Sequence, residues 1–330
     1  MKLGMTKWLP LALCALAACG APQEPPSAPL TADPPHESSS SDPGSAETEL
    51  DRGIAYLKSE KLEDARAHLE KSLQLKATGD AHYYLGVIKE KQRDIPGAEE
   101  SYKKALALDG RLTEAATNLS AIYLEDPPRP DEAIAVLQAA QAKTPGDARV
   151  AQNLAYALGL KGDVAGASKQ YDDALAKGDD AMVRFAYGTM LFEHKELEKA
   201  AEQLKKALAG AKDDAPLLVT LGRMLGGSKA YGDCVTAFDR AIKIKATEPE
   251  WFVRRGTCRH EIKDEAGAQS DFQAAIKVDP KFAAAHYYLG LSLLETRKPN
   301  SAIAELEKAA LLGGDIAKAA KVKLKVLTKK

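Results

Sequence analysis

One hexapeptide occurs twice, far apart in the chain, and it restricts the fold more than any other feature. Ala81–Gly86 reads AHYYLG, and the same six residues return at Ala285–Gly290. In both copies the glycine is followed by alanine 12 and 19 residues later, and an apolar pattern of helical spacing continues between them. A unit copied at this distance builds an array of repeats rather than one globular core.

The same template fits eight consecutive units between Ala46 and Leu312, with a period of 33 to 35 residues. The first small residue of the eight units is Gly53, Gly86, Ser120, Ala155, Gly188, Gly222, Gly256 and Gly290. A second small position falls at Ala65, Ala98, Ala133, Ala167, Ala200, Cys234, Ala268 and Ala302. Small residues at fixed offsets allow two helices to approach closely.

Each unit contains two segments with apolar residues at the spacing of an amphipathic helix, so each unit predicts a helix pair. A single pair cannot bury its apolar faces, and neighbouring pairs must therefore stack. The period near 34 and the small residues at these offsets resemble the tetratricopeptide repeat (TPR) family. The resemblance implies an all-α solenoid of about eight helix pairs over residues 46–312. Residues 313–330, with a stripe of Ile316, Ala320 and Leu324 among lysines, predict a capping helix with a basic tail.

The turns between the helices carry recognisable signals. Asp147, Asp180 and Asp214 precede first helices and are expected N-caps. Prolines 96, 130 and 299 are expected near the starts of second helices, where a missing N–H costs little. In the sixth unit Gly226-Gly227 lies near the end of the first helix, and glycine there costs about 1 kcal/mol against alanine. We expect the lowest local stability in that unit.

Residues 1–18 have the form of a secretory signal, with Lys2 and Lys7 before a short apolar run. Leu16-Ala17-Ala18-Cys19 resembles the lipobox of bacterial lipoproteins, in which the cysteine is acylated after cleavage. The alternative is an ordinary signal peptide followed by an accidental cysteine. By the same resemblance, Gly20 in place of aspartate favours the outer membrane, with the protein facing the periplasm.

Residues 19–46 predict a disordered tether behind the lipidated cysteine. Gly20–Ala46 contains seven prolines, a run of four serines and no lysine or arginine, and it is too polar to bury a core. Extended Pro-rich chain spans about 3 Å per residue, so the tether would reach roughly 80 Å from the bilayer. The lipid anchor is the one membrane contact that we expect.

Charge and motif content exclude several classes of function. The formal net charge of −1 argues against a nucleic-acid partner, although the lysines of the basic tail could face an acidic partner or lipid headgroups instead of water. No metal-binding, phosphate-binding or nucleophile motif is present, so we expect no metal, no cofactor and no enzymatic activity. The pair His260-Glu261 is the one candidate for acid–base chemistry, with chance pairing as the stronger interpretation. His82 and His286 are expected to pack in helices rather than to bind ligands.

Two cysteines remain in the repeats, Cys234 on a second helix and Cys258 on the next first helix. In an oxidising compartment thiols tend to pair, but the Cβ atoms must come within about 4.5 Å. A disulfide and two buried free thiols both remain open, and the sequence slightly favours free thiols.

In the TPR family, ligands usually lie along the concave face that first helices line. Carried over by offset, this resemblance implies a protein-binding groove with Tyr83, Tyr156, Leu160, Phe185, Phe192, Arg223 and Tyr287. We expect Tyr156, Phe185 and Phe192 to gather into one exposed apolar patch, although Tyr83 and Tyr287 could instead pack against neighbouring helices.

The resulting hypothesis is a lipid-anchored, non-enzymatic scaffold that binds other cell-envelope proteins in the assembly of a secretion, type IV pilus or motility machine. Alternatives are an adaptor for periplasmic cell-wall hydrolases, a factor for outer-membrane protein insertion and, with least support, an enzyme. The repeat specifies binding and not the partner. Oligomeric state is not specified by the sequence.

Overall fold

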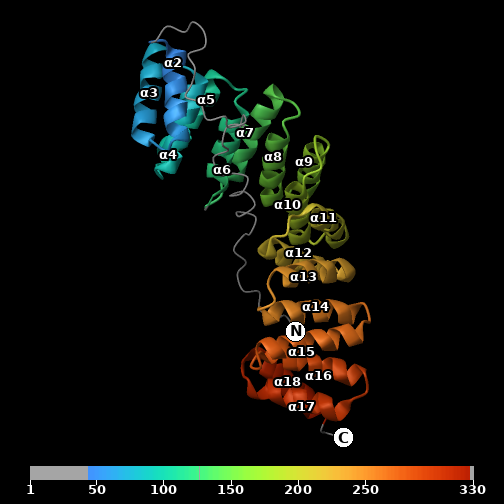
Figure 1. The fold of residues 1–330 in the computed structure, drawn as a ribbon. Helices are drawn as coiled ribbons and strands as arrows, with labels where there is room; N and C mark the ends of the chain where they lie inside the picture. Colours follow the sequence, from blue (N-terminus) through green and yellow to red (C-terminus); the bar gives the residue numbers. More distant parts are fainter. Residues whose placement is uncertain (1–43, 126, 328–330) are drawn as a thin grey trace. The chain divides into compact units, whose positions relative to one another are not determined.

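The computed structural model describes residues 44–125 and 127–327. Within these residues every regular element is an α-helix, and the 17 helices form eight pairs followed by one last helix (Figure 1). The prediction of an all-α array of about eight helix pairs with a capping helix is therefore confirmed. The expected signal sequence, Cys19 and nearly all of the expected tether lie outside the described residues, as do Lys329 and Lys330.

The chain divides into two compact units between Asp179 and Asp180. The first unit contains α2 (Ala46–Lys58), α3 (Leu62–Leu75), α4 (Gly79–Lys91), α5 (Ile95–Leu108), α6 (Thr113–Leu124), α7 (Pro130–Lys143), α8 (Ala148–Lys161) and α9 (Val164–Leu175). The second unit contains α10 (Ala181–Glu193), α11 (Leu197–Gly210), α12 (Ala215–Gly227), α13 (Tyr231–Ile244), α14 (Pro249–Glu261), α15 (Glu265–Val278), α16 (Ala283–Glu295), α17 (Pro299–Leu311) and α18 (Gly314–Leu327).

Within a pair, the two helices touch where the first helix carries a small residue. A Cβ atom placed on Gly86 would lie only 2.5 Å from the ring of Tyr102, and one on Gly256 would lie 2.6 Å from the ring of Phe272. Both rings are buried. The same contact recurs at Gly53 with Leu69, at Gly188 with Leu204, at Gly222 with Phe238 and at Gly290 with Leu306. A large side chain of the second helix thus fills the space that the glycine leaves.

The expected helix starts are confirmed. The carboxylates of Asp147, Asp180 and Asp214 accept hydrogen bonds from backbone N–H groups in the first turns of α8, α10 and α12. Such a cap satisfies amides that have no partner inside the helix. Prolines 96, 130 and 299 occupy the first or second position of α5, α7 and α17.

The turns inside the pairs share a backbone conformation that the sequence patterns did not reveal. Seven of the eight pairs have a left-handed residue seven positions after the first small residue: Glu60, Arg93, Gly162, Lys195, Lys229, Lys263 and Arg297. The next residue then donates its N–H to a carbonyl five residues back, as Asp94 does to Lys89 at 2.8 Å. This is the Schellman end of a helix, which usually carries glycine. Here only the fourth pair has it, and long charged side chains take the position elsewhere.

The helix α18 covers the end of the second unit. Ala320 shares an apolar cluster with Leu306 and Ala309 of α17, and Tyr287 and Leu324 pack against that cluster. Residues 313–327 therefore act as the predicted cap. Across the described ranges, no helix combines the length and the apolar character needed to cross a membrane.

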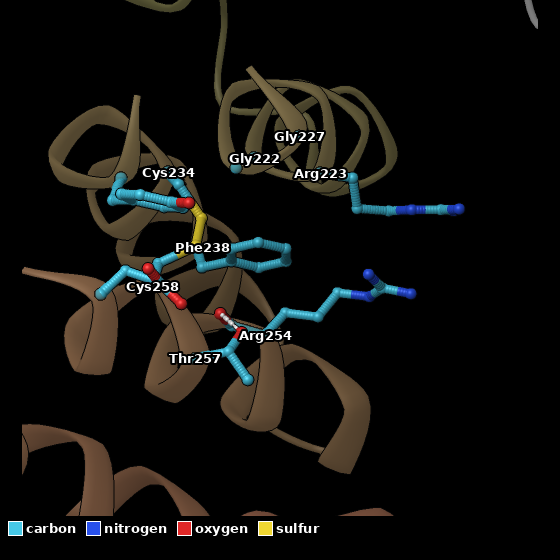
Figure 2. Close-up of a pocket in the computed structure, with 11 residues that line it drawn as sticks. Gly222, Arg223, Gly227, Cys234, Phe238, Arg254, Thr257 and Cys258 are labelled. Atoms are coloured by element: carbon cyan, nitrogen blue, oxygen red, sulfur yellow. Dashed lines mark hydrogen bonds between the residues drawn. A yellow bond between two sulfur atoms is a disulfide. The ribbon is translucent and has the colours of Figure 1, made fainter. Parts of the chain in front are cut away.

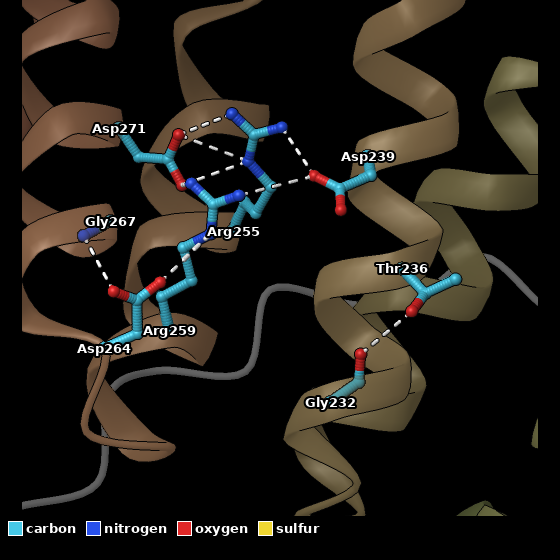
Figure 3. A network of polar contacts seen from close by, with 8 residues as sticks. All are labelled: Gly232, Thr236, Asp239, Arg255, Arg259, Asp264, Gly267 and Asp271. Atoms are coloured by element: carbon cyan, nitrogen blue, oxygen red, sulfur yellow. Dashed lines mark hydrogen bonds and ion pairs between the residues drawn. The ribbon is translucent and has the colours of Figure 1, made fainter.

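A network of ion pairs joins three consecutive helices of the second unit (Figure 3). Arg255 and Arg259 of α14 both contact the carboxylate of Asp271 on α15, and Arg255 also reaches Asp239 on α13 at 2.7 Å. Asp271 is buried, and a buried carboxylate is tolerated only when it is paired. These arginines therefore hold repeat to repeat.

A second network closes the first helix pair of the chain. The enclosed carboxylate of Glu49 on α2 contacts Arg52 at 3.0 Å, His68 at 2.6 Å and Lys71 at 2.8 Å. Hydrogen bonds from Lys71 and then His68 lower the pKa of Glu49 to about 2. The folded helix pair therefore stabilises the ionised carboxylate of Glu49.

We expect Gly86→Ala to destabilise the protein, because the new methyl group meets the ring of Tyr102. That ring cannot swing away, since its hydroxyl donates to Glu90 at 2.7 Å and accepts from Asn118 at 3.2 Å. Overpacking of this kind costs about 1–3 kcal/mol. Chemical denaturation followed by circular dichroism measures the loss. In the control Gly232→Ala the methyl group meets nothing within 4 Å, so an equal loss in both variants would contradict the close-contact argument.

The stability of the first unit should fall as the pH is lowered from about 4.5 to 2. The folded-state pKa of Glu49 is below the ordinary value. In this pH window the Glu49 carboxylate is therefore protonated in the unfolded chain and ionised in the folded chain, so that lower pH favours unfolding. Glu49→Gln should flatten this part of the pH profile in denaturation experiments, whereas Glu47→Gln on the exposed side of α2 should not. A profile unchanged by Glu49→Gln would show that the network does not drive the acid response.

Candidate functional site

The residues expected in the groove are distributed over both units and differ in exposure. In the first unit Leu160 is 45% exposed, and Tyr156 is partly buried against the cluster of α4 to α8. In the second unit Phe192 and Arg223 are partly buried, and Tyr287 packs against the α17–α18 cluster. Burial raises the pKa of the Tyr287 hydroxyl, which agrees with a packing role at the capped end.

Two of these residues belong to the core instead of an exposed surface. Tyr83 is 9% exposed and its ring lies 5.9 Å from that of Tyr102, while Phe185 is 6% exposed. The expectation that Phe185 presents an exposed apolar anchor is therefore wrong. Both residues stand one helical turn before the first small residue, where the side chain turns into the helix pair. Tyr156, the third residue of the expected patch, lies in the first unit, and its place in such a patch stays a prediction.

The second unit contains a pocket of about 340 Å³ between α12, α13 and α14 (Figure 2). It is lined by Gly222, Arg223, Gly226, Gly227, Tyr231, Cys234, Phe238, Arg254, Thr257, Cys258 and Glu261. Of the seven residues named above for the predicted groove, Arg223 lines the pocket. The wall is mixed, because the aromatic ring and the sulfur atoms are apolar and the arginines and glutamate are charged.

A disulfide between Cys234 and Cys258 forms part of this wall and joins α13 to α14 (Figure 2). Of the two alternatives that the sequence left open, the structure has the disulfide and not the free thiols. Gly226 of α12 lies against it, since a Cβ atom there would be 3.3 Å from both sulfur atoms. Gly226, which looked only destabilising in the sequence, therefore leaves room for the crosslink.

Two arginines from successive first helices reach the same pocket. Arg223 extends from α12 and Arg254 from α14, and in Figure 2 their side chains point in the same direction. The carboxylate of Glu250 accepts from Arg254 Nε at 2.7 Å. Burial lowers the pKa of Arg223, and the nearby charge of Arg254 lowers it further, whereas Glu250 raises it. The pocket thus places two arginine side chains beside an apolar surface.

Tyr231, at the start of α13, and Glu261, at the C-terminal end of α14, line the pocket as well. Burial, and then the charge of Glu261, raise the pKa of Tyr231. The Nδ1 atom of His260 lies 2.7 Å from a carboxylate oxygen of Glu265, whereas Glu261 lines the pocket. The two residues of the hypothetical acid–base pair therefore have different neighbours.

His82 and His286 stand at equivalent positions of two repeats, where His82 is partly buried and His286 is buried. His286 is buried, with Nδ1 2.6 Å from Glu305 and Nε2 3.0 Å from the carbonyl of Pro280. Burial lowers the pKa of His82, and Lys104 lowers it further. Among residues 44–125 and 127–327, no group of three or more His, Cys, Asp or Glu side chains is arranged to hold a metal ion.

The sequence reasoning missed Arg254, Phe238 and Tyr231 as pocket residues. The groove had been placed by fixed offsets from the first small residue, and Arg254 stands two positions before Gly256, outside those offsets. The available signal was the pair of arginines on two successive first helices. Phe238 could not have been recognised, because it also fills the helix-pair contact with Gly222.

A model of the tetratricopeptide repeat matches residues 50–111, 89–148, 153–216 and 266–320. Together these segments cover more than half of the chain. The match agrees with the helix pairs observed in both units.

Individual relatives share the repeat over different lengths. The type IV pilus assembly protein PilF of Pseudomonas aeruginosa is 27% identical over 201 residues, which cover 60% of this chain and 78% of PilF. A solved structure of Pseudomonas aeruginosa PilF matches with a TM-score of 0.51 at 23% identity, over 62% of this chain and 94% of that one. The E3 ubiquitin-protein ligase CHIP of Arabidopsis thaliana is 30% identical over 83 residues, but this stretch spans only 30% of CHIP and 25% of this chain.

We expect the disulfide to stabilise the second unit measurably. It joins residues 24 apart in sequence, and a loop of that size is worth about 3 kcal/mol in the chain-entropy model. A reductant should lower the melting temperature of the native chain and leave the variant Cys234→Ala with Cys258→Ala unchanged. Alanine fits in place of Cys234, because the other repeats carry alanine at that position. A non-reduced digest without the linked peptide, or equal effects of reductant on both proteins, would contradict the crosslink.

Proposed function

The chain belongs to the tetratricopeptide repeat family, and from this membership we propose that it is a lipid-anchored scaffold that binds other cell-envelope proteins. In the proposal it catalyses no reaction and assists the assembly of a type IV pilus, secretion or motility machine. Stacked helix pairs present continuous surfaces for partner proteins, and the repeat serves protein–protein interaction.

The observation that carries the choice of machine is the similarity to PilF, which is named for type IV pilus assembly. The similarity extends over most of PilF, so it involves several successive repeats rather than a single motif. Structural likeness to PilF supports the shared fold and adds nothing about the partner. We therefore assign the pilus, or a machine of related construction, as the place of action.

The sequence before the repeats supports the anchor. Cys19 ends the lipobox-like Leu16-Ala17-Ala18-Cys19, and diacylglycerol together with N-acylation supplies more than the single chain that holds only marginally. In this proposal the protein is attached to the outer membrane and faces the periplasm. A tether of the length of residues 20–45 confines the repeats near the bilayer and raises their effective concentration for other membrane-bound components.

The second unit supplies the chemical support for binding. Its pocket places arginine, aromatic and disulfide surfaces side by side, and arginine and aromatic residues are enriched at interfaces. The arginines of the neighbouring network differ, because Asp239 and Asp271 hold them within the scaffold.

Cys19→Ala should release the protein from the membrane fraction and abolish labelling with radioactive palmitate. Crosslinking in intact bacterial cells, followed by mass spectrometry, should recover envelope assembly proteins with the native chain and fewer of them with the released variant. The matched control Cys14→Ala changes a cysteine inside the expected signal sequence and should leave both results unchanged. The proposal would be refuted if the Cys19→Ala protein stayed in the membrane fraction without label. It would also be refuted if crosslinking with the native chain recovered no envelope protein.

A further inference from the structure

The capping helix α18 carries valines as well as lysines on the face that it turns away from the repeats. Its other face packs on α17, where Ala320 joins the apolar cluster of Leu306 (Figure 1). On the outer face Val322 is 67% exposed and Val326 is 64% exposed, and residues four apart lie on the same side of a helix. The last helix of a repeat array normally presents a polar face to water, so two exposed valines require a reason.

The lysines of α18 exceed the acidic groups that could neutralise them. The helix has four lysines and one acidic residue, although the formal net charge of the whole chain is −1. Lys318 pairs with Asp315 at 2.9 Å. Within residues 44–125 and 127–327, no carboxylate forms an ion pair with Lys321, Lys323 or Lys325. The end of the second unit therefore presents positive charge that the fold does not use.

The residue types of this face suit an anionic membrane surface better than a protein. Protein interfaces are depleted in lysine, and their affinity depends most on Trp, Tyr and Arg, none of which occurs in α18. A lysine can lay its methylene chain over apolar surface while its ammonium group stays in the polar layer, where anionic lipids attract it. A second copy of the chain is disfavoured, because a two-fold contact through this face would oppose the same lysines.

We infer that the outer face of α18 binds an anionic lipid bilayer. The ammonium groups of Lys321 and Lys325 lie at the lipid phosphates in this contact, and Val322 and Val326 add apolar area at the interface. The inference rests on the proposed function in one respect, that an anchor at Cys19 holds the repeats near a bilayer. It goes beyond that function by assigning a second membrane contact, near the other end of the sequence.

The test uses the full native chain, reconstituted into vesicles of phosphatidylglycerol with phosphatidylcholine or of phosphatidylcholine alone. Lysines are acetylated briefly and the modified sites are quantified by mass spectrometry. Acetylation of Lys321 and Lys325 should be at least about fivefold slower on the anionic vesicles, the factor that the attraction of one lysine to an anionic surface supplies. Lys243 and Lys277 are exposed on other helices of the second unit and should react equally on both kinds of vesicle.

A charge-matched pair of variants identifies the face. Lys321→Gln with Lys325→Gln should restore fast acetylation of Lys323 on the anionic vesicles, because too little charge remains to hold the helix at the surface. Lys243→Gln with Lys277→Gln lowers the net charge of the second unit equally and should leave the protection of α18 unchanged. Circular dichroism checks that both variants keep their helices. An equal loss of protection in the two variants would contradict a specific role of α18.

The remaining outcomes decide on the valines and on the other possible occupants. Val322→Ser with Val326→Ser keeps every charge, and acetylation as slow as in the native chain would remove the valines from the contact. Equal acetylation of native α18 on anionic and neutral vesicles would overturn the inference. Protection that grows with protein concentration without vesicles would assign the face to a second copy, and protection seen only in intact cells would assign it to an acidic protein.

Palmitate labelling separates this inference from the proposed function. If the native chain is labelled but α18 is not protected on anionic vesicles, the anchor stands and the second contact fails. If α18 is protected while the chain takes up no palmitate, the second contact stands and the proposed anchor fails.

Discussion

The close approach of the two helices in each pair is the interaction on which the rest of the structure depends. A glycine on the first helix leaves a space that a ring or leucine from the second helix fills, as Tyr102 does at Gly86. The side chain that fills the space is itself buried, so the contact fixes the distance between the axes. Repetition of the contact every 33 to 35 residues gives successive pairs the same geometry and lets them stack.

The pocket of the second unit follows from this regularity together with two local departures from it. Regular spacing brings equivalent faces of α12 and α14 to the same side, so that Arg223 and Arg254 meet. Cys234 replaces the alanine found at the second small position of most repeats, which allows a crosslink to Cys258. Gly226 then omits the side chain that would press on the sulfur atoms.

Most of the fold could be predicted from local signals, because helix caps, prolines and apolar spacing act within a few residues. Asp147 and Pro130 mark helix starts as expected. The site was predicted less well. The distance in sequence from the first small residue did not show that Phe185 is buried, since exposure depends on which neighbouring helix covers a position. The left-handed turn could not be predicted either, because it is usually recognised from a glycine, whereas residues such as Arg93 and Lys229 adopt it here.

By itself, the sequence determined the repeat, its period, the number of helix pairs and the capping helix, because each depends on a pattern that recurs along the chain. Only the tertiary structure decided which residues meet across repeats: the pairing of Cys234 with Cys258, the separation of Arg254 from Arg255, and the burial of Tyr83 and Phe185. The physical reason is that such contacts depend on side-chain direction and on distances of a few ångströms between elements that are far apart in sequence. A period predicts where helices lie, but the packing of neighbouring pairs determines which side chains remain accessible to a partner.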